Sequence, residues 1–333
     1  MKTAFLCEKE DRIRQVYGQD VLDALVTSVG LTDTVYSKAR VLENPSGFVD
    51  TEMVFSTWGM PVFSVEEIKR FLPNLKAVFY AAGSVQSFAR PFLECGVQVF
   101  SAWAANAVPV AEYTVAQILL ANKGFFPQSR MMKQGRIAET KSLKEKYPGN
   151  YGERVGLIGV GMIGSLVAKM LQNHRLEVVV YDPFLSEVRA RELGVTRVSL
   201  QELFSTCFTV SNHMANNART CGMLNGALFE SMRPYATFLN TGRGAQVVEE
   251  DLVRVLTERP DLTAVLDVTY PEPPAQGHPF YTLPNCILTP HIAGSLANET
   301  HRMAVYMEQE CQRYQRGEAC RYGVTLAMLE TMA

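Results

Sequence analysis

The sequence lacks the patterns that mark a disulfide scaffold, a zinc module or a membrane protein. Its seven cysteines are scattered singly, without a Cys-x-x-Cys pair. An odd, unpaired set of this kind is typical of reduced thiols. No apolar run reaches the roughly 18 residues that a membrane-spanning helix needs. We therefore expect no structural disulfide, no metal site and no membrane association.

The chain also has no excess of one charge, since its formal net charge is −2. A nucleic-acid partner is therefore not expected. The N-terminus becomes acidic at Glu8 before any long apolar core forms, so we expect no secretory signal peptide and a cytoplasmic protein. With 333 residues, 47% apolar and 20% charged, the composition is that of a globular protein of two domains.

Short apolar runs alternate with amphipathic stretches along the chain, which predicts α/β domains with parallel sheets. The strands expected in the first hundred residues are Thr3–Leu6, Met53–Ser56, Ala77–Tyr80 and Val97–Phe100, with helices over Val65–Phe71 and Phe88–Leu93. A long apolar helix is expected from Val108 to about Gln134, in part at a subunit interface. The charged segment Ile137–Gly152 is expected to be an exposed connection.

A glycine-rich segment in the middle of the chain has the context of a dinucleotide-binding βαβ unit. The order is a strand over Val155–Ile158, the loop Gly159-Val160-Gly161-Met162-Ile163-Gly164, a helix over Met162–Leu171, a strand over Leu176–Tyr181, and then Asp182. The first glycine allows the tight turn, the second admits a pyrophosphate, and the third lets helix and strand pack closely. The phosphates are expected at the N–H groups that begin the helix.

Asp182 is expected to accept hydrogen bonds from the adenosine ribose and to repel a 2′-phosphate. The residues that follow it, Pro183 and Phe184, supply no arginine. The sequence therefore favours NAD over NADP. Arg189 and Arg191, expected on the next helix, weaken that preference.

Three polar residues follow three successive predicted strands, and these are Arg243, Glu272 and His291. The carboxyl ends of parallel strands share one edge of a sheet, the edge that also holds the dinucleotide, so these residues are expected to converge there. An arginine fork suits a substrate carboxylate and carbonyl. A histidine beside a carboxylate suits proton transfer near neutral pH. The set fits hydride transfer to a 2-oxo acid.

Three segments resemble the signatures of the D-isomer-specific 2-hydroxyacid dehydrogenases. They are Thr241–Gly244, Leu266–Pro273 and Thr289–Gly294, and Asn106-Ala107 with Val110–Glu112 is similar to the family's helix start. The resemblance implies a Rossmann-type doubly wound domain over 104–297. It also implies a flavodoxin-like α/β substrate domain over 1–103, completed by 298–333. It further implies a homodimer that reversibly reduces a 2-oxo acid to a D-2-hydroxy acid with NADH.

The resemblance also implies individual roles. Arg243 would bind the substrate carboxylate and carbonyl, and His291, paired with Glu272, would be the general acid and base. Asp267 would hold the nicotinamide carboxamide. Further contacts to the cofactor would come from Met162, Ile163, Thr241, Gly242, His291 and Gly294. The substrate would meet Gly83 and Ser84 through their backbone N–H groups. Trp58 and Met60 lie where phosphoglycerate dehydrogenases carry a basic residue, and these two side chains are expected to offer a broad apolar wall instead.

Some features depart from the family or leave alternatives open. The segment Ser211–Asn217 lacks the family's usual proline, and no basic residue for a substrate phosphate occurs beside Trp58, so we expect an unphosphorylated substrate. His213 flanks a cofactor ribose or is structural. His174, His278 and His301 are expected at the surface, and Asn106 orients a hinge or caps a helix. One rival is a non-catalytic NAD-sensing regulator. A second rival is a formate dehydrogenase, but that family carries an amide at this position, so Glu272 argues against it.

Overall fold

The computed structural model describes residues 2–330, and these residues form two compact units. The first comprises Met1–Ala107 with Ser295–Ala333, and the second comprises Val108–Gly294. The domain boundaries expected from the sequence, after residues 103 and 297, lie within a few residues of these. Helix α6 (Trp103–Asn122) begins in the first unit and continues into the second.

The first unit contains a six-stranded sheet in the order β13-β5-β4-β3-β1-β2, in which only β13 is antiparallel. The strands are β1 (Lys2–Leu6), β2 (Val35–Tyr36), β3 (Thr51–Ser56), β4 (Ala77–Tyr80), β5 (Gln98–Ser101) and β13 (Gly323–Val324). The order of the five parallel strands is that of flavodoxin. The predicted flavodoxin-like fold is therefore confirmed.

Helices cover this sheet and enclose one apolar core. They are α1 (Glu10–Val29), α2 (Lys38–Glu43), α3 (Pro45–Phe48), α4 (Val65–Phe71), α5 (Ala89–Glu94) and α14 (Asn298–Gln315), with a short 3₁₀ helix, η3 (Met328–Glu330). The core is rich in aromatic rings, and Phe79 stacks on both Phe55 and Phe100 from the neighbouring strands. Residues 295–330 belong to this unit as well.

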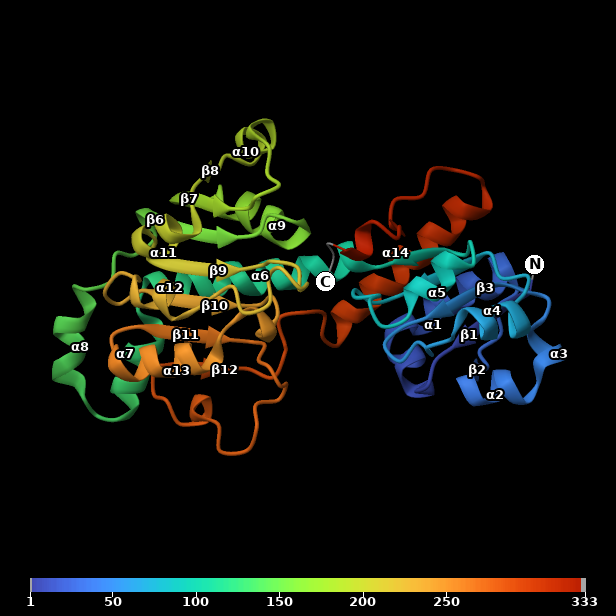
Figure 1. The fold of residues 1–333 in the computed structure, drawn as a ribbon, viewed down its shortest axis with the longest axis horizontal. Coiled ribbons are helices and arrows are strands. Elements are labelled where there is room, and N and C mark those ends of the chain that lie inside the picture. The colour runs from blue at the N-terminus through green and yellow to red at the C-terminus, as the bar shows by residue number, and fades with distance from the viewer. Residues whose placement is uncertain (1, 331–333) are drawn as a thin grey trace. The chain divides into compact units, whose positions relative to one another are not determined.

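The second unit contains a seven-stranded parallel sheet in the order β12-β11-β10-β9-β6-β7-β8 (Figure 1). The strands are β6 (Tyr151–Ile158), β7 (Arg175–Tyr181), β8 (Thr196–Arg197), β9 (Thr209–Asn212), β10 (Thr237–Asn240), β11 (Thr263–Leu266) and β12 (Cys286–Leu288). The chain leaves β6 first toward β7 and later returns to β9 on its other side. This reversal is the switch point at which doubly wound sheets bind nucleotides.

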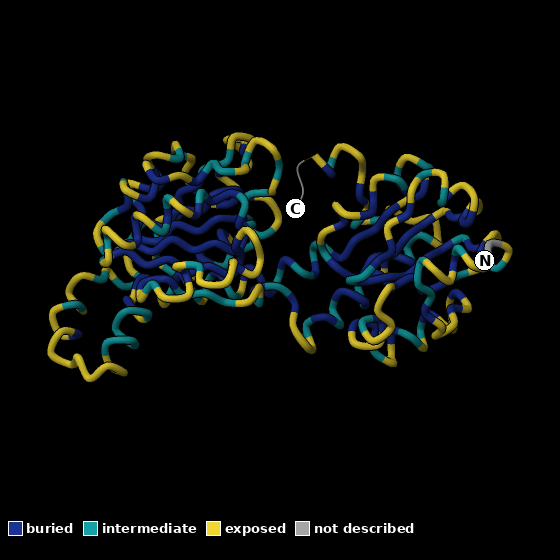
Figure 2. The backbone as a smooth tube through the Cα atoms, turned by 60° about the horizontal axis from the view of Figure 1, so that its bottom comes forward, coloured by how far each residue is buried: buried dark blue, intermediate teal, exposed yellow. Residues whose placement is uncertain are grey.

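Helices cover both faces of the second sheet, which Figure 2 shows as a buried layer with exposed turns around it. They are α9 (Met162–Leu171), α10 (Glu187–Leu193), α11 (Leu200–Thr206), α12 (Gly226–Glu230) and α13 (Glu249–Glu258), with the 3₁₀ helices η1 (Gly244–Gln246) and η2 (Pro279–Tyr281). Successive strand residues point to opposite faces. Accordingly Phe238 packs with α11, α12 and α13, whereas Leu239 packs with α6 and α9.

The prediction of one long helix from Val108 to about Gln134 is wrong in one respect. It is broken by Gly124, whose φ of 65° is left-handed, and continues as a separate helix, α7 (Phe125–Lys133). The charged segment after it is not merely a connection, because its first half forms α8 (Ile137–Lys144). Among residues 2–330, no helix is both long and apolar enough to cross a bilayer.

Candidate active site

The glycine loop after β6 has the geometry that a pyrophosphate requires. Gly159 has a φ of 85°, and a Cβ there would lie 3.0 Å from the carbonyl oxygen of His213. A Cβ on Gly164 would lie 2.1 Å from the Gly159 carbonyl oxygen, so helix and loop are in direct backbone contact. A Cβ on Gly161 would meet nothing within 4 Å. Each glycine therefore fits its predicted role, and open space lies where the phosphates would approach α9.

Asp182 directly follows β7 and holds the glycine loop in place. Its Oδ2 accepts a hydrogen bond from the Val160 N–H at 2.9 Å, and its Oδ1 accepts one from the Phe184 N–H at 2.8 Å. A carboxylate has further lone pairs, so these bonds are compatible with the predicted ribose contact. Arg189 and Arg191 lie on α10 with exposed side chains. The bond to Val160 was not foreseen from the sequence.

His291 and Glu272 form a close pair beyond the carboxyl end of β12. His291 Nδ1 lies 2.6 Å from Glu272 Oε1, and the two side chains are 48% and 41% exposed. The His291 backbone has a left-handed φ of 54°, which is uncommon outside glycine. Its N–H donates to the carbonyl oxygen of Asp267 at 3.0 Å. The ring is thus fixed through Nδ1 and through its backbone, and Nε2 is the nitrogen left for a reacting atom.

Asp267, which follows β11, anchors the turn that carries His291. The carboxylate is 1% exposed. It accepts hydrogen bonds from the N–H groups of Ile292 and Ala293 at 2.8 and 2.9 Å, and from the Thr289 hydroxyl at 2.6 Å. A carboxylate that accepts three bonds from one turn fixes the backbone of that turn. Its predicted contact with the nicotinamide carboxamide stays a prediction.

Arg243 lies in the turn between β10 and η1. One guanidinium nitrogen, Nη1, donates to the Gly242 carbonyl oxygen at 2.8 Å. Burial lowers the pKa of Arg243, and the nearby Glu272 carboxylate partly offsets that effect. An arginine nevertheless stays protonated. Within residues 2–330 no other acceptor binds this guanidinium, so a half-buried cation has free donors for an anionic ligand.

One buried residue near these side chains, Glu249, was not singled out from the sequence. Glu249, at the start of α13, accepts a hydrogen bond from the Tyr270 N–H at 2.8 Å and lies 3.8 Å from His278 Nε2. Tyr270 and His278 flank the segment that contains Glu272, so one carboxyl group contacts both ends of it. Burial raises the pKa of Glu249 to about 6. His278 is half-buried and not the surface residue expected from the sequence.

His213, which follows β9, has surroundings unlike those of His291. It is 9% exposed. Its Nε2 lies 2.9 Å from the Ser211 hydroxyl and its Nδ1 lies 3.3 Å from the Thr241 hydroxyl. Burial lowers its pKa to about 3. Both ring nitrogens have protein partners, so the structural interpretation of His213 is favoured over a direct ribose contact.

The predicted substrate residues of the first unit lie after β3 and β4. Gly83 and Ser84 follow β4, and within residues 2–330 their backbone N–H groups have no hydrogen-bond partner. The Ser101 hydroxyl donates to the carbonyl oxygen of Gly83 at 2.7 Å and fixes this turn. Trp58 is half-buried against the core, and Met60 is 7% exposed within it. Met60 therefore packs inward instead of forming an exposed wall.

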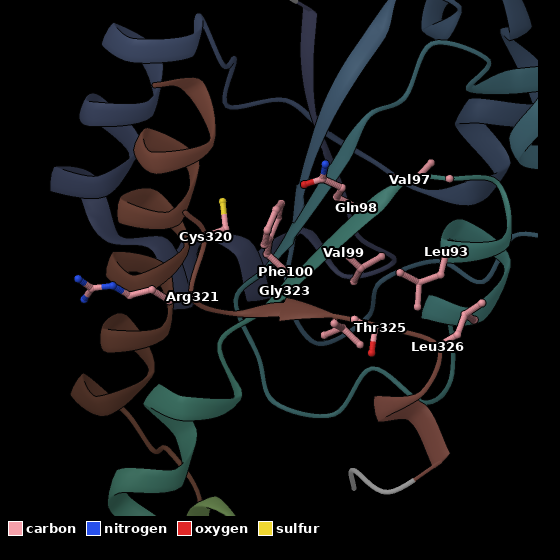
Figure 3. A pocket seen from close by; sticks show the side chains of 12 residues that line it. Leu93, Val97, Gln98, Val99, Phe100, Cys320, Arg321, Gly323, Thr325 and Leu326 are labelled. Carbon is pink, nitrogen blue, oxygen red and sulfur yellow. The ribbon is translucent and has the colours of Figure 1, made fainter. Parts of the chain in front are cut away.

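Two further features of the first unit bear on the site predictions. The Asn106 side-chain oxygen accepts a hydrogen bond from the Ser295 N–H at 3.0 Å, so Asn106 links α6 to the segment that leads into α14. Figure 3 shows a surface pocket of about 490 Å³ that is lined by residues of the paired strands β5 and β13 and of neighbouring segments, among them Leu93, Phe100 and Leu326. None of the predicted site residues lines this pocket.

Comparison with known proteins identifies the class. Residues 115–293 match the family described as D-isomer specific 2-hydroxyacid dehydrogenase, NAD binding domain. YoaD of Bacillus subtilis, assigned as a 2-hydroxyacid dehydrogenase, is 31% identical over 87% of this chain and 79% of its own length. The chain therefore belongs to the D-isomer-specific 2-hydroxyacid dehydrogenase family. Its second unit is an NAD-binding domain, and its cofactor is NAD(H), as the sequence predicted.

Other relatives support the family and the fold. A D-3-phosphoglycerate dehydrogenase from Archaeoglobus fulgidus is 28% identical over 79% of this chain, which spans about half the length of that relative. The crystal structure of the TT0316 protein from Thermus thermophilus superposes with a TM-score of 0.73, at 26% identity, over 97% of this chain and all of that one. D-mandelate dehydrogenase from Rhodotorula graminis has the same fold, with a TM-score of 0.81 at 19% identity and 97% coverage of both chains.

Proposed function

We propose that the protein reversibly reduces a 2-oxo acid to a D-2-hydroxy acid with NADH. The observation that carries the proposal is the 2.6 Å pair of His291 and Glu272, on the same sheet edge as Arg243 and the glycine loop. The bound nicotinamide supplies the hydride. The protein has to bind the carboxylate, polarise the carbonyl and deliver a proton to its oxygen.

Arg243 and His291 divide this work. The free donors of the half-buried Arg243 guanidinium suit a carboxylate and the adjacent carbonyl oxygen. His291, held at Nδ1 by Glu272, has Nε2 free to donate a proton to the carbonyl oxygen, and in the reverse direction to remove it from the hydroxyl. The Glu272 carboxylate, 2.6 Å from Nδ1, fixes the orientation of the ring. In the first unit, the free N–H groups of Gly83 and Ser84 are the proposed second contact for the carboxylate.

The substrate is proposed to be unphosphorylated, with Trp58 as an apolar contact. The glycine loop, Asp182, Thr241, Gly242, Asp267 and Gly294 are proposed to contact the cofactor. Asp182 supports NADH over NADPH, because its carboxylate lies directly after β7 and would repel a 2′-phosphate.

A homodimer is proposed on the surface formed by α7 and α8. None of the nine residues of α7 is buried, and Phe125, Met132 and Ile137 are 48%, 52% and 55% exposed. Exposed apolar residues gathered in one place mark an interaction site. Light scattering of the wild type and of Met132→Glu would test this, since the variant is expected to be monomeric.

The experiment that tests the function follows NADH oxidation against glyoxylate, hydroxypyruvate, pyruvate, 2-oxoisocaproate and phenylpyruvate, with NADPH in parallel. Turnover of one or more of these acids, with NADH preferred, would support the proposal. Tight NADH binding without turnover of any would favour the alternative, a non-catalytic NAD-sensing protein on the same scaffold.

A further inference from the structure

Three fully buried amide side chains lie directly beneath the Arg243 turn. They are Asn212 at the end of β9, Asn240 at the end of β10, and Gln246 in η1, and each is 0% exposed. Asn212 and Asn240 are paired residues in the parallel ladder. The Asn212 amide group donates to Asn240 Oδ1 at 3.0 Å and to Gln246 Oε1 at 2.6 Å. We call these three residues the amide triad.

The amide triad holds the backbone of Arg243 on both sides. The Arg243 N–H donates to Gln246 Oε1 at 3.2 Å, and the Arg243 carbonyl oxygen accepts from Asn240 Nδ2 at 3.2 Å. The Gly242 N–H donates to Asn240 Oδ1 at 3.0 Å. A Cβ on Gly242 would lie within 3 Å of both Asn212 and Gln246. The turn therefore packs against the triad as well as bonding to it.

The same triad also holds the segment after β9. Asn212 Oδ1 accepts from the Met214 N–H at 3.2 Å. Gln246 Nε2 donates to the carbonyl oxygens of Met214 and Ala215, both at 2.9 Å. Two chain segments from different strands are thus joined through three side chains.

Every side-chain nitrogen and oxygen of the triad has at least one hydrogen-bond partner, which makes the triad act as a unit. Both amide hydrogens of Asn212 and both of Gln246 are donated, and each of the three side-chain oxygens accepts at least one bond. Removing one buried member leaves the others and the backbone unsatisfied, which costs more than the lost bond alone. Without the Gln246 amide, for example, the Arg243 N–H and the Met214 carbonyl oxygen would lose their partner, and the Ala215 carbonyl oxygen would keep only the Thr220 hydroxyl.

We propose that the amide triad positions Arg243 for the substrate carboxylate and couples that position to the segment His213–Ala215. The proposal rests on the proposed function, in which Arg243 binds the substrate. The triad residues do not touch substrate in this scheme, so they are positioning residues. A displacement of about 1 Å in a group that orients substrate lowers turnover by about 10²-fold, which sets the scale of the expected effect.

The test compares Gln246→Met with a matched control, Asn285→Leu. Asn285 is also a buried amide, and it donates to the carbonyl oxygens of Leu256 and Leu262. It precedes β12, at the opposite, amino-terminal edge of the same sheet. Both variants remove a buried amide, so both are expected to lower Tm. Only Gln246→Met is expected to raise the KM for the 2-oxo acid, by at least about 10-fold, while the Kd for NADH changes less than about 3-fold.

A second variant and a double variant complete the design. Asn212→Leu still allows Gln246 to bond to the backbone, so this variant can replace Gln246→Met if Gln246→Met does not fold. It is also expected to raise the KM for the 2-oxo acid. In the variant with both substitutions, the effect on KM is expected to be smaller than the product of the two single effects, because members of one network are not additive. Equal changes in KM for Gln246→Met and Asn285→Leu, or multiplicative effects in the double variant, would overturn the proposal.

Amide hydrogen exchange separates this inference from the proposed function. Faster exchange over 241–246 and 213–216 in Gln246→Met, but not in Asn285→Leu, supports positioning by the triad even if the wild type reduces none of the 2-oxo acids. Unchanged exchange in both segments overturns the positioning claim even if the wild type is fully active. If the wild type reduces none of the 2-oxo acids but these differences in exchange are observed, only the proposed function is overturned.

Discussion

Two histidines follow strands of the same parallel sheet, yet their surroundings are opposite. His213, after β9, is buried between the hydroxyl groups of Ser211 and Thr241, and burial lowers its pKa to about 3. His291, after β12, is half-exposed and paired with the carboxylate of Glu272. A buried imidazole with neutral partners stays unprotonated at neutral pH. The comparison shows that the end of a strand supplies only the location, whereas solvent and a carboxylate partner make a histidine suitable for proton transfer.

The largest expected effect comes from removing the exposed histidine. His291→Ala should lower kcat by about 10²–10⁴-fold, the range of a positioned acid or base. The Kd for NADH, measured by fluorescence titration, should be unchanged because the glycine loop and Asp182 are intact. A variant that keeps full turnover would remove His291 from the reaction.

The buried histidine should instead affect stability in acid. The folded pKa of His213 is about 3 against an ordinary value of 6.5, so the unfolded chain binds the proton more tightly. The histidine therefore causes no loss of stability above pH 6.5. Stability falls as the pH drops from about 6.5 to about 3, by on the order of 5 kcal/mol at about 1.4 kcal/mol per pKa unit.

His213→Gln should make urea unfolding less sensitive to pH in this window, while turnover stays within about 10-fold of the wild type, below the range for loss of an acid or base. Parallel pH profiles of stability for the two proteins would show that His213 is not the buried neutral group described above.

A smaller effect is expected from the carboxylate that distinguishes the two histidines. Glu272→Gln keeps a side chain of the same shape but removes the negative charge that lies 2.6 Å from His291 Nδ1. Turnover is expected to fall by about 10²-fold, the lower end of the range for acid–base assistance. The NADH-oxidation assay at a saturating 2-oxo acid measures this loss, and a variant with the kcat of the wild type would argue against a role for the pair.

The smallest effect concerns Glu249, a second carboxyl group, which contacts the segment that carries Glu272. Glu249 is buried, and its pKa rises from 4.5 to about 6. The neutral form is favoured in the folded protein, so stability is fully present below pH 4.5 and is lost as the pH rises through about 6. Glu249→Gln should recover about 2 kcal/mol above pH 6, at about 1.4 kcal/mol per pKa unit. Chemical unfolding at pH 4.5 and 7.5 checks this, and an equal difference at both values would contradict it.

The arrangement of the sheet and its edge could be predicted because local patterns determine them. A fixed spacing relates the strand Val155–Ile158 to the glycine loop and to Asp182. An apolar strand precedes each of the three polar residues Arg243, Glu272 and His291. Strand ends in a parallel sheet share one edge, so the sequence was enough to expect convergence. The 2.6 Å separation of His291 and Glu272 agrees with that expectation.

Other features were missed because they depend on single backbone angles or long-range partners. Helix α1 was not predicted, and its pattern is interrupted by Gly18, which has a φ of 64° inside the helix. The break at Gly124 depends on one left-handed residue in a long apolar run. The two amide partners of Asn212 lie 28 and 34 positions further along the sequence. The polar Asn212 at the end of a buried strand is visible in the sequence, but its partners could be identified only from the fold.

The most direct test of the account measures NADH oxidation with a saturating 2-oxo acid for the wild type, His291→Ala and His213→Gln under the same conditions. The account predicts that turnover falls by about 10² or more in His291→Ala and is largely retained in His213→Gln, with NADH bound equally by all three. Loss of turnover in His213→Gln together with an active His291→Ala would contradict it.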